Sequence, residues 1–280
     1  MTERTERKEH IFDKYLRQDK LPHIWCPGCG NGTVVNALLH AIDKTGLEQD
    51  KIVLVAGIGC SSRANGYMNF CGMHTNHGRA LAYATGVKMH NPELKVIVLT
   101  GDGDCTSIGG NHFIHACRRN IDITTVVFNN ANYGMTGGQY SPTTPVNART
   151  KTSVYGNIEP NFDICSLAAT SGATYVARST IANATMMVSQ FEKALNHRGF
   201  SVVEAICDCP TLFGRINKLG DAVAMLADKK TRFITAAQAK NMTPDELSGK
   251  IITGEFVNRT NLPEYTEQYD VLIKNAKEEE

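Results

Sequence analysis

Short runs of apolar residues alternate along the chain with longer segments in which apolar residues recur at helical spacing. The runs predict strands over residues 52–56, 95–100, 123–128, 173–177 and 201–206. Several of them are rich in Val and Ile and apolar at nearly every position, as strands buried on both faces are. Strands that alternate with helices are typical of parallel βαβ units. The pattern therefore predicts an α/β fold with a mostly parallel sheet flanked by helices.

Helical spacing predicts helices over residues 79–90, 110–119, 162–171 and 181–197. An earlier helix is expected around residues 34–42, with Gly46 well placed to end it. Residues 1–209 are expected to form the α/β domain. After about Asp208 the composition changes, because strand-like apolar runs disappear and charges are scattered. Residues 210–280 are therefore expected to form an irregular extension that wraps on the domain or on a partner, with its last residues mobile.

Composition narrows the class of protein. The 280 residues carry a formal net charge of +1, which provides no electrostatic reason to expect nucleic acid or an anionic membrane as a partner. No apolar stretch reaches the roughly 18 residues of a spanning helix, and the charged start MTERTERKEH lacks the apolar core of a secretory signal. A cytoplasmic location is therefore expected. There, nine cysteines suggest buried thiols, metal ligands or catalytic thiols rather than disulfides.

A candidate phosphate site follows one of the predicted strands. The segment KVIVLTGDGD runs from a buried strand directly into Asp102 and Asp104, each preceded by a glycine. Open α/β sheets bind ligands outside the carboxyl ends of their strands, and glycines let the backbone approach a phosphate closely. A carboxylate beside a diphosphate requires a hard cation such as Mg²⁺ between the two. The alternative is an ordinary Asp-Gly turn.

The next strand adds amide oxygens to this candidate site. After Asp104, 24 residues precede Asn129 and Asn130, which follow the strand ITTVVF. One helix and one return strand take about that many residues, so both strand ends are expected at the same sheet edge. Together the two segments resemble the GDG…NN signature of thiamine-diphosphate enzymes. The resemblance implies that Asp102, the side chain of Asn130 and the backbone carbonyl of Asn132 bind Mg²⁺.

The same resemblance implies a cradle of residues around thiamine diphosphate. The expected contacts are Ile58, Gly59, Cys60, Ser61, His77, Gly78, Gly101, Asp102, Gly103, Asp104, Asn130, Asn132, Tyr133, Gly134, Met135 and Thr136. Among them, Gly103 and Asp104 are expected at the diphosphate. For Thr136 the alternative is a hydroxyl that only caps its own loop. His74 and Arg79 are weaker candidates for contact with the cofactor.

Four cysteines either precede a predicted helix or follow a strand end, and could meet at this edge of the sheet. Cys26 and Cys29 form a C-x-x-C turn in WCPGCG, Cys60 follows the strand in IVLVAGIGC, and Cys209 follows the strand SVVEAI. Four thiolates from separate segments suit a [4Fe–4S] cluster or a Cys₄ zinc site. The remaining cysteines are expected to be buried thiols, although Cys105 directly follows GDGD and could approach the cofactor.

The motifs WCPGCG, GIGCSS and CPT, in this order with GDGD…NN, resemble the β subunits of 2-oxoacid:ferredoxin oxidoreductases, most closely the 2-oxoglutarate type. The resemblance spans roughly residues 20–215. It implies a [4Fe–4S] cluster held by Cys26, Cys29, Cys60 and Cys209. Cys207 is the competing fourth ligand, and Cys209 is favoured because the family cysteine immediately precedes Pro-Thr.

The resemblance also implies the two catalytic candidates, Arg63 and His77. Arginine can bind a carboxylate through two parallel hydrogen bonds, and the family has a basic residue that faces the substrate where Arg63 follows GCSS. The alternative is a surface arginine. His77 lies in the HGRA segment, which in the family lies against the thiamine and its diphosphate; the alternative is a structural histidine.

The implied activity is the oxidative decarboxylation of 2-oxoglutarate with coenzyme A to succinyl-CoA and CO₂. Electrons would pass through the [4Fe–4S] cluster to ferredoxin. No glutamate that would activate the thiamine stands out in the chain. We therefore expect an α subunit to supply it, together with much of the substrate and coenzyme A site, in an αβ pair or its dimer (αβ)₂.

Two other functions remain open from the sequence. The enzyme could act on pyruvate or another 2-oxoacid, because Arg63 would bind the carboxylate of any of them. The chain could instead be a non-enzymatic Cys₄ zinc scaffold, although zinc binding would not need the GDGD…NN pair.

Overall fold

The computed structural model describes residues 10–278. The first nine residues of the chain and the terminal Glu279 and Glu280 lie outside the described residues. The prediction that the last residues are mobile falls on Glu279 and Glu280. The strands are β1 (Ile52–Ala56), β2 (Cys71–His74), β3 (Lys95–Gly101), β4 (Ile123–Asn129), β5 (Tyr175–Thr180), β6 (Ser201–Ile206), β7 (Phe233–Thr235) and β8 (Ile251–Asn258). The α-helices are α1 (Ile11–Tyr15), α2 (Asn31–Thr45), α3 (Ala64–Tyr67), α4 (Ala80–His90), α5 (Gly110–Arg119), α6 (Ile164–Thr170), α7 (Ala184–Asn196), α8 (Ala222–Arg232), α9 (Ala236–Ala239), α10 (Pro244–Leu247) and α11 (Tyr265–Glu278).

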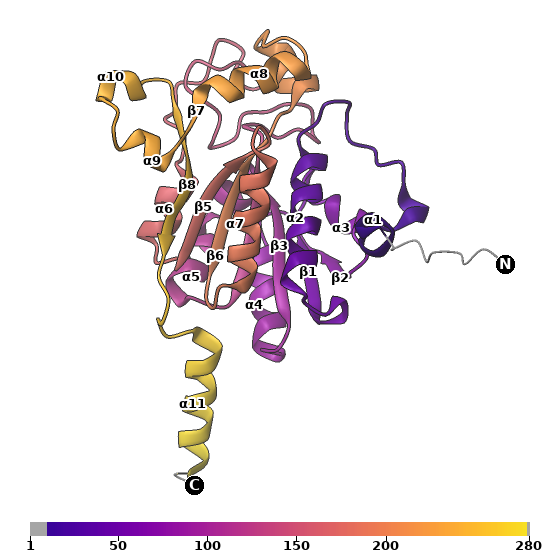
Figure 1. Cartoon of the computed structure of the whole chain (residues 1–280), viewed down its shortest axis with the longest axis vertical. Coiled ribbons are helices and arrows are strands. Elements are labelled where there is room, and N and C mark those ends of the chain that lie inside the picture. Colours follow the sequence, from indigo (N-terminus) through magenta and orange to yellow (C-terminus); the bar gives the residue numbers. More distant parts are fainter. Residues whose placement is uncertain (1–9, 279–280) are drawn as a thin grey trace, which may run out of the picture.

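All eight strands join one sheet in the order β2-β1-β3-β4-β6-β5-β8-β7. Six of them, from β2 to β5, run parallel, whereas β8 pairs antiparallel with β5. The predicted α/β class with a mostly parallel sheet is therefore confirmed. The parallel order brings the carboxyl ends of β1, β3, β4 and β6 to the same edge (Figure 1).

Helices cover both faces of the sheet (Figure 1). On one face, α2 and α7 bury a core that includes Leu38 and Phe191, both fully excluded from solvent. On the other face, α4, α5 and α6 pack a second core around Phe113 and Phe200, whose rings meet edge to face at 6.4 Å. Strands buried from both sides must be apolar at nearly every position, which is why their runs were readable in the sequence.

The predicted strands and helices of the first 209 residues all form, with small shifts at their ends. Gly46 ends α2 in the left-handed conformation that favours glycine, with φ of 66°. The strand predicted over residues 173–177 is displaced, because β5 runs over Tyr175–Thr180. Its last three residues are polar but buried, as is typical of strand ends that contribute to a site. The division of the chain near residue 209 remains a prediction.

The expectation that the chain lacks strands after residue 209 is wrong. Strand β8 extends the main sheet along β5, and β7 pairs with β8. Most of β8 is only partly buried, because it lies towards an edge of the sheet and carries polar residues such as Glu255. Its sequence, IITGEFVN, has two apolar pairs separated by Thr, Gly and Glu, so no continuous apolar run marks it.

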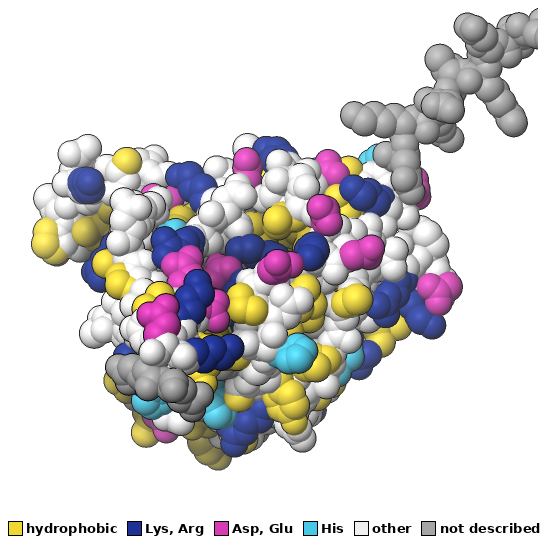
Figure 2. Space-filling view, turned by 90° about the horizontal axis from the view of Figure 1, so that it is seen from below, with side chains coloured by type: hydrophobic (Ala, Val, Ile, Leu, Met, Phe, Trp, Pro, Cys, Tyr) yellow, Lys and Arg dark blue, Asp and Glu magenta, His cyan; other side chains and the backbone are white. Residues whose placement is uncertain are grey.

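The final helix, α11, projects from the body of the molecule at the end opposite the candidate site (Figure 1). Several of its apolar side chains are exposed, including Leu272 at 61%. Viewed from this end, positive and negative side chains lie close together, with histidines and small apolar areas between them (Figure 2). No helix in the part of the chain that is described combines the length and apolarity needed to cross a membrane.

We predict that Leu38→Ala lowers the free energy of unfolding by about 2–5 kcal/mol, because it leaves a cavity between α2 and the sheet. The matched control, Leu272→Ala on the exposed face of α11, should change it by less than about 0.5 kcal/mol. Urea denaturation followed by circular dichroism measures both values. Equal effects of the two substitutions would contradict the assignment of the core.

Candidate active site

The segments that follow β1, β3 and β4 surround a cavity of about 290 Å³. Its lining residues are Ile58, Gly59, Cys60, Ser61, His77, Gly101, Asp102, Gly103, Asp104, Phe128, Asn130, Asn132, Tyr133, Gly134, Met135 and Thr136. Of the cofactor contacts expected from the sequence, only Gly78 is not in the lining. Phe128, the buried residue before the Asn pair, was not anticipated; its place at the end of an apolar strand was the available signal.

Oxygen atoms converge at one end of this cavity. The amide oxygen of Asn130 lies 2.7 Å from the carbonyl oxygen of Asn132, 3.2 Å from its side-chain oxygen and 3.2 Å from Oδ1 of Asp102. Neighbouring oxygens in an octahedral Mg²⁺ shell with bonds of about 2.0–2.1 Å are about 2.9 Å apart. An Asn130 oxygen that faces these other acceptor oxygens is stable when a cation lies between them. The alternative is an Asn130 amide rotated so that its nitrogen takes the place of its oxygen. The donor set therefore fits Mg²⁺.

Asp102 is held by hydroxyl groups from a distant loop. Ser141 Oγ and Thr143 Oγ1 donate hydrogen bonds of 2.5 and 2.6 Å to its Oδ2, so that Oδ1 is left to face Asn130. Burial raises the pKa of Asp102 to about 6, against the lowering effect of these hydrogen bonds. A divalent cation beside the carboxylate would favour its ionised form. Nothing in the sequence linked the two hydroxyl residues to Asp102.

Asp104 connects the GDGD loop to the segment that carries His77. Its Oδ1 accepts a hydrogen bond of 2.7 Å from the amide of Gly78 and lies 2.6 Å from Nδ1 of His77. Its Oδ2 accepts one of 2.8 Å from Thr100. A side chain at Gly57 would overlap this carboxylate, so glycine is required there. Asp104 thus bonds to the backbone of the segment after β2 and lies against His77, and its expected contact with a diphosphate remains a prediction.

The loop after Asn132 closes one wall of the cavity. The ring of Tyr133 packs where a side chain at Gly103 would otherwise lie, and its hydroxyl donates to the carbonyl of Gly103 at 3.3 Å. The same ring meets that of His77 edge to face at 5.9 Å. Thr136 donates to Oε1 of Gln139 at 2.6 Å within the loop. The loop-capping alternative for Thr136 therefore has a partner, while its side chain also lines the cavity.

The four predicted cluster cysteines line a second cavity, of about 220 Å³, next to the first. The indole of Trp25 donates to the carbonyl of Cys60 at 2.7 Å and so holds the WCPGCG turn against the segment after β1. The amide of Gly30 donates to the carbonyl of Asp208 at 3.1 Å, which brings the segment after β6 to the same place. A Cβ atom on Gly134 would lie 3.4 Å from Sγ of Cys60 and 3.9 Å from Sγ of Cys209.

The spacing of the thiols bears on which group they could hold. Tetrahedral zinc with bonds of about 2.3 Å holds its sulfur ligands about 3.8 Å apart. Within residues 10–278, no three of these four sulfurs lie within 4.8 Å of one another. A [4Fe–4S] cluster accepts wider spacing, because each thiolate binds a different iron. Burial, with the neighbouring thiols, raises the pKa of Cys29 to about 11, so binding of the cluster would displace its proton.

The competing ligand, Cys207, points away from the thiol cavity. It is buried, with Sγ 3.7 Å from Oδ1 of Asn31, and is absent from the lining residues. The geometry therefore supports Cys209. Of the other cysteines, Cys105, Cys117 and Cys165 are buried as expected, whereas the expectation is wrong for Cys71, which is exposed on β2. Cys105 packs in the core beneath α5 rather than in the cofactor cavity.

Arg63 lies where the thiol cavity meets an open hollow of about 520 Å³. Arg17, Lys20 and His74 also line this hollow, and no carboxylate does among the described residues. The hollow shares Ile58 and Met135 with the cofactor cavity. An anionic substrate that reaches the cofactor by this route would therefore meet positive charge.

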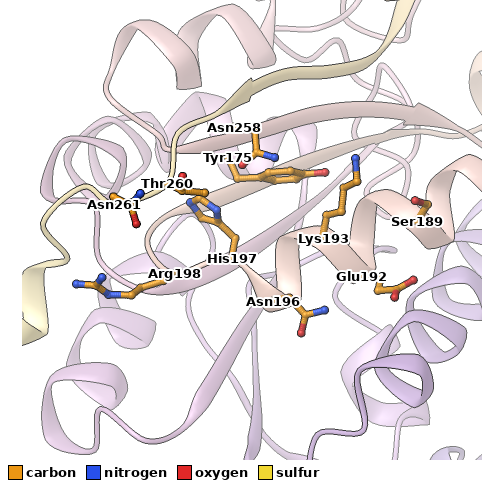
Figure 3. A pocket seen from close by; sticks show the side chains of 10 residues that line it. All are labelled: Tyr175, Ser189, Glu192, Lys193, Asn196, His197, Arg198, Asn258, Thr260 and Asn261. Atoms are coloured by element: carbon orange, nitrogen blue, oxygen red, sulfur yellow. The ribbon is translucent and has the colours of Figure 1, made fainter.

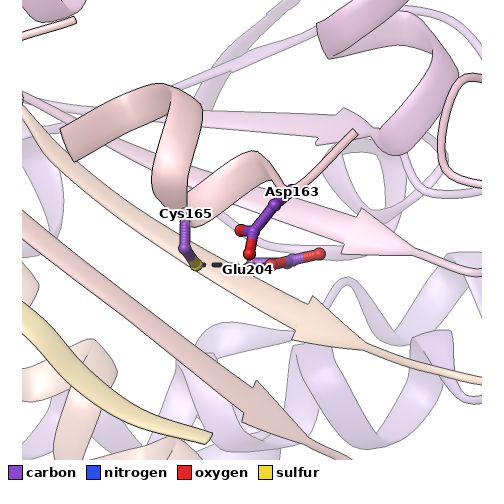
Figure 4. A group of neighbouring side chains, drawn as sticks. All are labelled: Asp163, Cys165 and Glu204. Carbon is purple, nitrogen blue, oxygen red and sulfur yellow. Dashed lines mark hydrogen bonds between the residues drawn. The ribbon is translucent and has the colours of Figure 1, made fainter. Parts of the chain in front are cut away.

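Two other features lie apart from this site. A polar hollow between α7 and the start of β5 includes Tyr175 and Lys193 and lies at the opposite end of the strands (Figure 3). Asp163, Cys165 and Glu204 place three potential metal ligands within 4.8 Å of one another (Figure 4). Arg178 forms ion pairs with both of these carboxylates, at 2.5 and 2.7 Å, so its guanidinium already occupies the place of a cation.

Comparisons with known proteins agree with this fold and site. Residues 57–205 match the family described as thiamine pyrophosphate enzyme, C-terminal TPP binding domain. The 2-oxoglutarate synthase subunit KorB of Methanothermobacter thermautotrophicus is 48% identical over 96% of this chain and 93% of its own. KorB of Methanocaldococcus jannaschii is 47% identical over 96% of this chain and 100% of its own. The 2-oxoacid:ferredoxin oxidoreductase subunit beta of Saccharolobus solfataricus is 43% identical over 67% of this chain and 62% of its own.

A solved structure extends the similarity to almost the whole chain. It is that of 2-oxoglutarate:ferredoxin oxidoreductase from Magnetococcus marinus with 2-oxoglutarate, coenzyme A and succinyl-CoA bound. The TM-score is 0.85 at 30% identity, covering 98% of this chain and 93% of that one.

The fold and its site define a thiamine-diphosphate-binding domain. More narrowly, the chain belongs to the KorB family, the β subunits of 2-oxoacid:ferredoxin oxidoreductases that depend on thiamine diphosphate.

We predict that Cys209→Ser loses most of the iron and brown absorption of the anaerobically purified complex, because its thiol lines the cavity with the other three. The matched control, Cys207→Ser two residues away, should retain both, since that thiol faces Asn31. Iron analysis and visible spectra measure the difference. Loss of iron only from the Cys207 variant would reverse the assignment, and a colourless wild-type protein containing zinc would support the scaffold alternative.

Proposed function

We propose that this chain is the catalytic β subunit of a cytoplasmic enzyme that oxidatively decarboxylates 2-oxoglutarate with coenzyme A to succinyl-CoA and CO₂. The observation that supports this best is the wall shared by the cofactor cavity and the thiol cavity. Cys60, Asn130, Gly134 and Met135 line both. Groups bound in the two cavities would be separated by single side chains, which suits the transfer of electrons from one to the other and then to ferredoxin.

The residues divide between two bound groups in this proposal. Asp102, Asn130 and the carbonyl of Asn132 hold Mg²⁺ against the diphosphate, and the lining residues of the 290 Å³ cavity cradle thiamine diphosphate. The ligands of the [4Fe–4S] cluster are Cys26, Cys29, Cys60 and Cys209. When bound, thiamine diphosphate supplies the carbanion and electron sink for decarboxylation, and the cluster accepts one electron at a time.

Two side chains act on the substrate side of the cavity. Arg63 binds a carboxylate of the 2-oxoacid where the thiol cavity meets the 520 Å³ hollow that Arg17 and Lys20 also line. His77 lines the cavity, and its Nδ1 lies 2.6 Å from Oδ1 of Asp104. A neighbouring carboxylate can orient an imidazole, so we assign to His77 the exchange of a proton in the cavity.

The cavity lacks one required element. No glutamate is present among its lining residues, and the carboxylates of Asp102 and Asp104 are both already engaged. The glutamate that activates the thiamine would therefore come from an α subunit, with the active site at the interface. The β chain alone would be inactive, and the assembly would be an αβ pair or its dimer.

The relatives favour 2-oxoglutarate over other substrates. The two KorB proteins are named for it, and the Magnetococcus enzyme binds it together with coenzyme A. The Saccharolobus relative is named for 2-oxoacids in general, so the same reaction on pyruvate or another 2-oxoacid is the second candidate.

We predict that the complex purified without oxygen together with its α subunit reduces a viologen dye when given 2-oxoglutarate and coenzyme A. Pyruvate should give little reduction, and the β chain alone should give none. Equal rates with pyruvate would contradict the substrate. No reduction with any 2-oxoacid, by a brown protein that contains thiamine diphosphate, would overturn the proposed reaction.

We predict that Arg63→Ala lowers kcat/KM for 2-oxoglutarate by roughly 10- to 150-fold, as expected when a charge-assisted hydrogen bond of about 1.5–3 kcal/mol is lost. The matched control is Arg198→Ala, which removes an exposed arginine at the opposite end of the sheet. It should stay within about twofold of wild type. Steady-state kinetics of the complex measure both, and an unchanged Arg63 variant would remove this residue from the substrate site.

A further inference from the structure

Asn129, the first residue of the Asn pair, has no ligand role in the proposed Mg²⁺ site, yet both the nitrogen and the oxygen of its side chain form hydrogen bonds. Its Nδ2 donates a hydrogen bond of 2.7 Å to Oε1 of Glu204. Its Oδ1 accepts one of 3.1 Å from the amide of Ala131 and lies 3.1 Å from Oγ1 of Thr143. The side chain thus joins three separate segments: β6, the turn after β4 and the distant loop.

The turn that Asn129 supports determines where the cation ligands point. Ala131 has φ of 60°, a left-handed conformation that residues with a Cβ adopt only at a cost. Two hydrogen bonds hold it there: its amide donates to Asn129, and its carbonyl accepts from Thr144 at 2.7 Å. Because the chain reverses at Ala131, the side chain of Asn130 and the carbonyl of Asn132 face the same point.

Asn129 also contacts the group that orients Asp102. Thr143 Oγ1 lies 2.6 Å from Oδ2 of Asp102 and 3.1 Å from Oδ1 of Asn129. A shift of the Asn129 side chain would therefore disturb two of the three proposed cation ligands through the turn at Ala131, and the carboxylate of Asp102 through Thr143.

A buried ion pair between β5 and β6 sets the orientation of the Asn129 amide. Glu204 is only 3% exposed, and its Oε2 accepts a hydrogen bond of 2.7 Å from Nε of Arg178. Oε1 of the ionised Glu204 can only accept a hydrogen bond. The amide of Asn129 therefore presents its nitrogen to Glu204 on β6 and its oxygen to the turn. The second carboxylate on Arg178, that of Asp163, is half exposed and lies next to Glu204 (Figure 4).

We propose that Asn129 is a positioning residue for the divalent cation of the thiamine-diphosphate site, and that Glu204, charge-balanced by Arg178, sets its orientation. This inference rests on the proposed function. It explains a buried charged pair in the middle of the sheet, which contributes to the site without touching it. A buried ion pair is weak evidence for stability alone, because desolvation offsets most of its attraction.

The test measures the Mg²⁺ concentration that half-saturates thiamine diphosphate binding, by calorimetry on the αβ complex. Asn129→Ala removes the hydrogen bonds to Glu204, Ala131 and Thr143, and Asn129→Asp places a carboxylate against Glu204. Each should raise the half-saturating concentration by about tenfold or more, the range of coupling expected for contacts of this kind. The double variant Asn129→Asp/Glu204→Gln reverses the donor and acceptor while keeping the total charge, and should recover to within about threefold of wild type.

The matched control is Asp163→Asn, which loosens Arg178 from its exposed side and should remain within about twofold of wild type. Iron content and thermal unfolding without cofactor, measured on every variant, separate positioning from loss of fold. Wild-type affinity in both Asn129 variants, or no recovery in the double variant, would overturn the inference while leaving the proposed function standing. A wild-type complex that binds no thiamine diphosphate in the presence of Mg²⁺ would overturn both.

Discussion

The parallel order of β1, β3, β4 and β6 is the constraint on which the rest of the structure depends. Each strand ends in a segment with its own chemistry, and the shared direction of the strands delivers all four segments to one edge. Hydrogen bonds from the turn before α2 to these segments then set distances that the sheet alone does not determine. The indole of Trp25 on the carbonyl of Cys60 and the amide of Gly30 on that of Asp208 are two examples.

In the proposed function, two different kinds of group would bind at that edge through two different kinds of ligand atom. Oxygen ligands come from β3 and β4 and converge at separations near 3 Å, as a small hard cation requires. Thiols come from β1, β6 and the turn before α2, and are spaced more widely, as a cluster requires. Cys60 and Asn130 line both cavities, so the two sites are direct neighbours. The lining of the cofactor cavity contains no glutamate, which is the reason for proposing that a partner subunit completes the site.

The fold was predictable to a large extent because its strands are buried on both faces and therefore apolar throughout. The predictions for β1 and β6 match the observed bounds. Strand β8 escaped prediction because polar residues and a glycine interrupt its apolar run. The site was predictable where neighbouring residues carry it, as in GDGD and WCPGCG. It was not predictable where distant side chains complete it, as Ser141 and Thr143 do for Asp102, because polar loop residues have no periodicity that identifies a partner.

The sequence by itself determined the alternation of strands and helices, the order of the motifs and the residue types able to bind Mg²⁺ and iron. These features are local, since each depends on neighbours in the chain or on the period of a single element. Only the tertiary structure decided between Cys207 and Cys209 as the thiol that lines the cavity with the other three, because residues two apart no longer share a face once the strand has ended. It alone placed Glu204 beneath Asn129, since strands β6 and β4 become neighbours only when the sheet has formed.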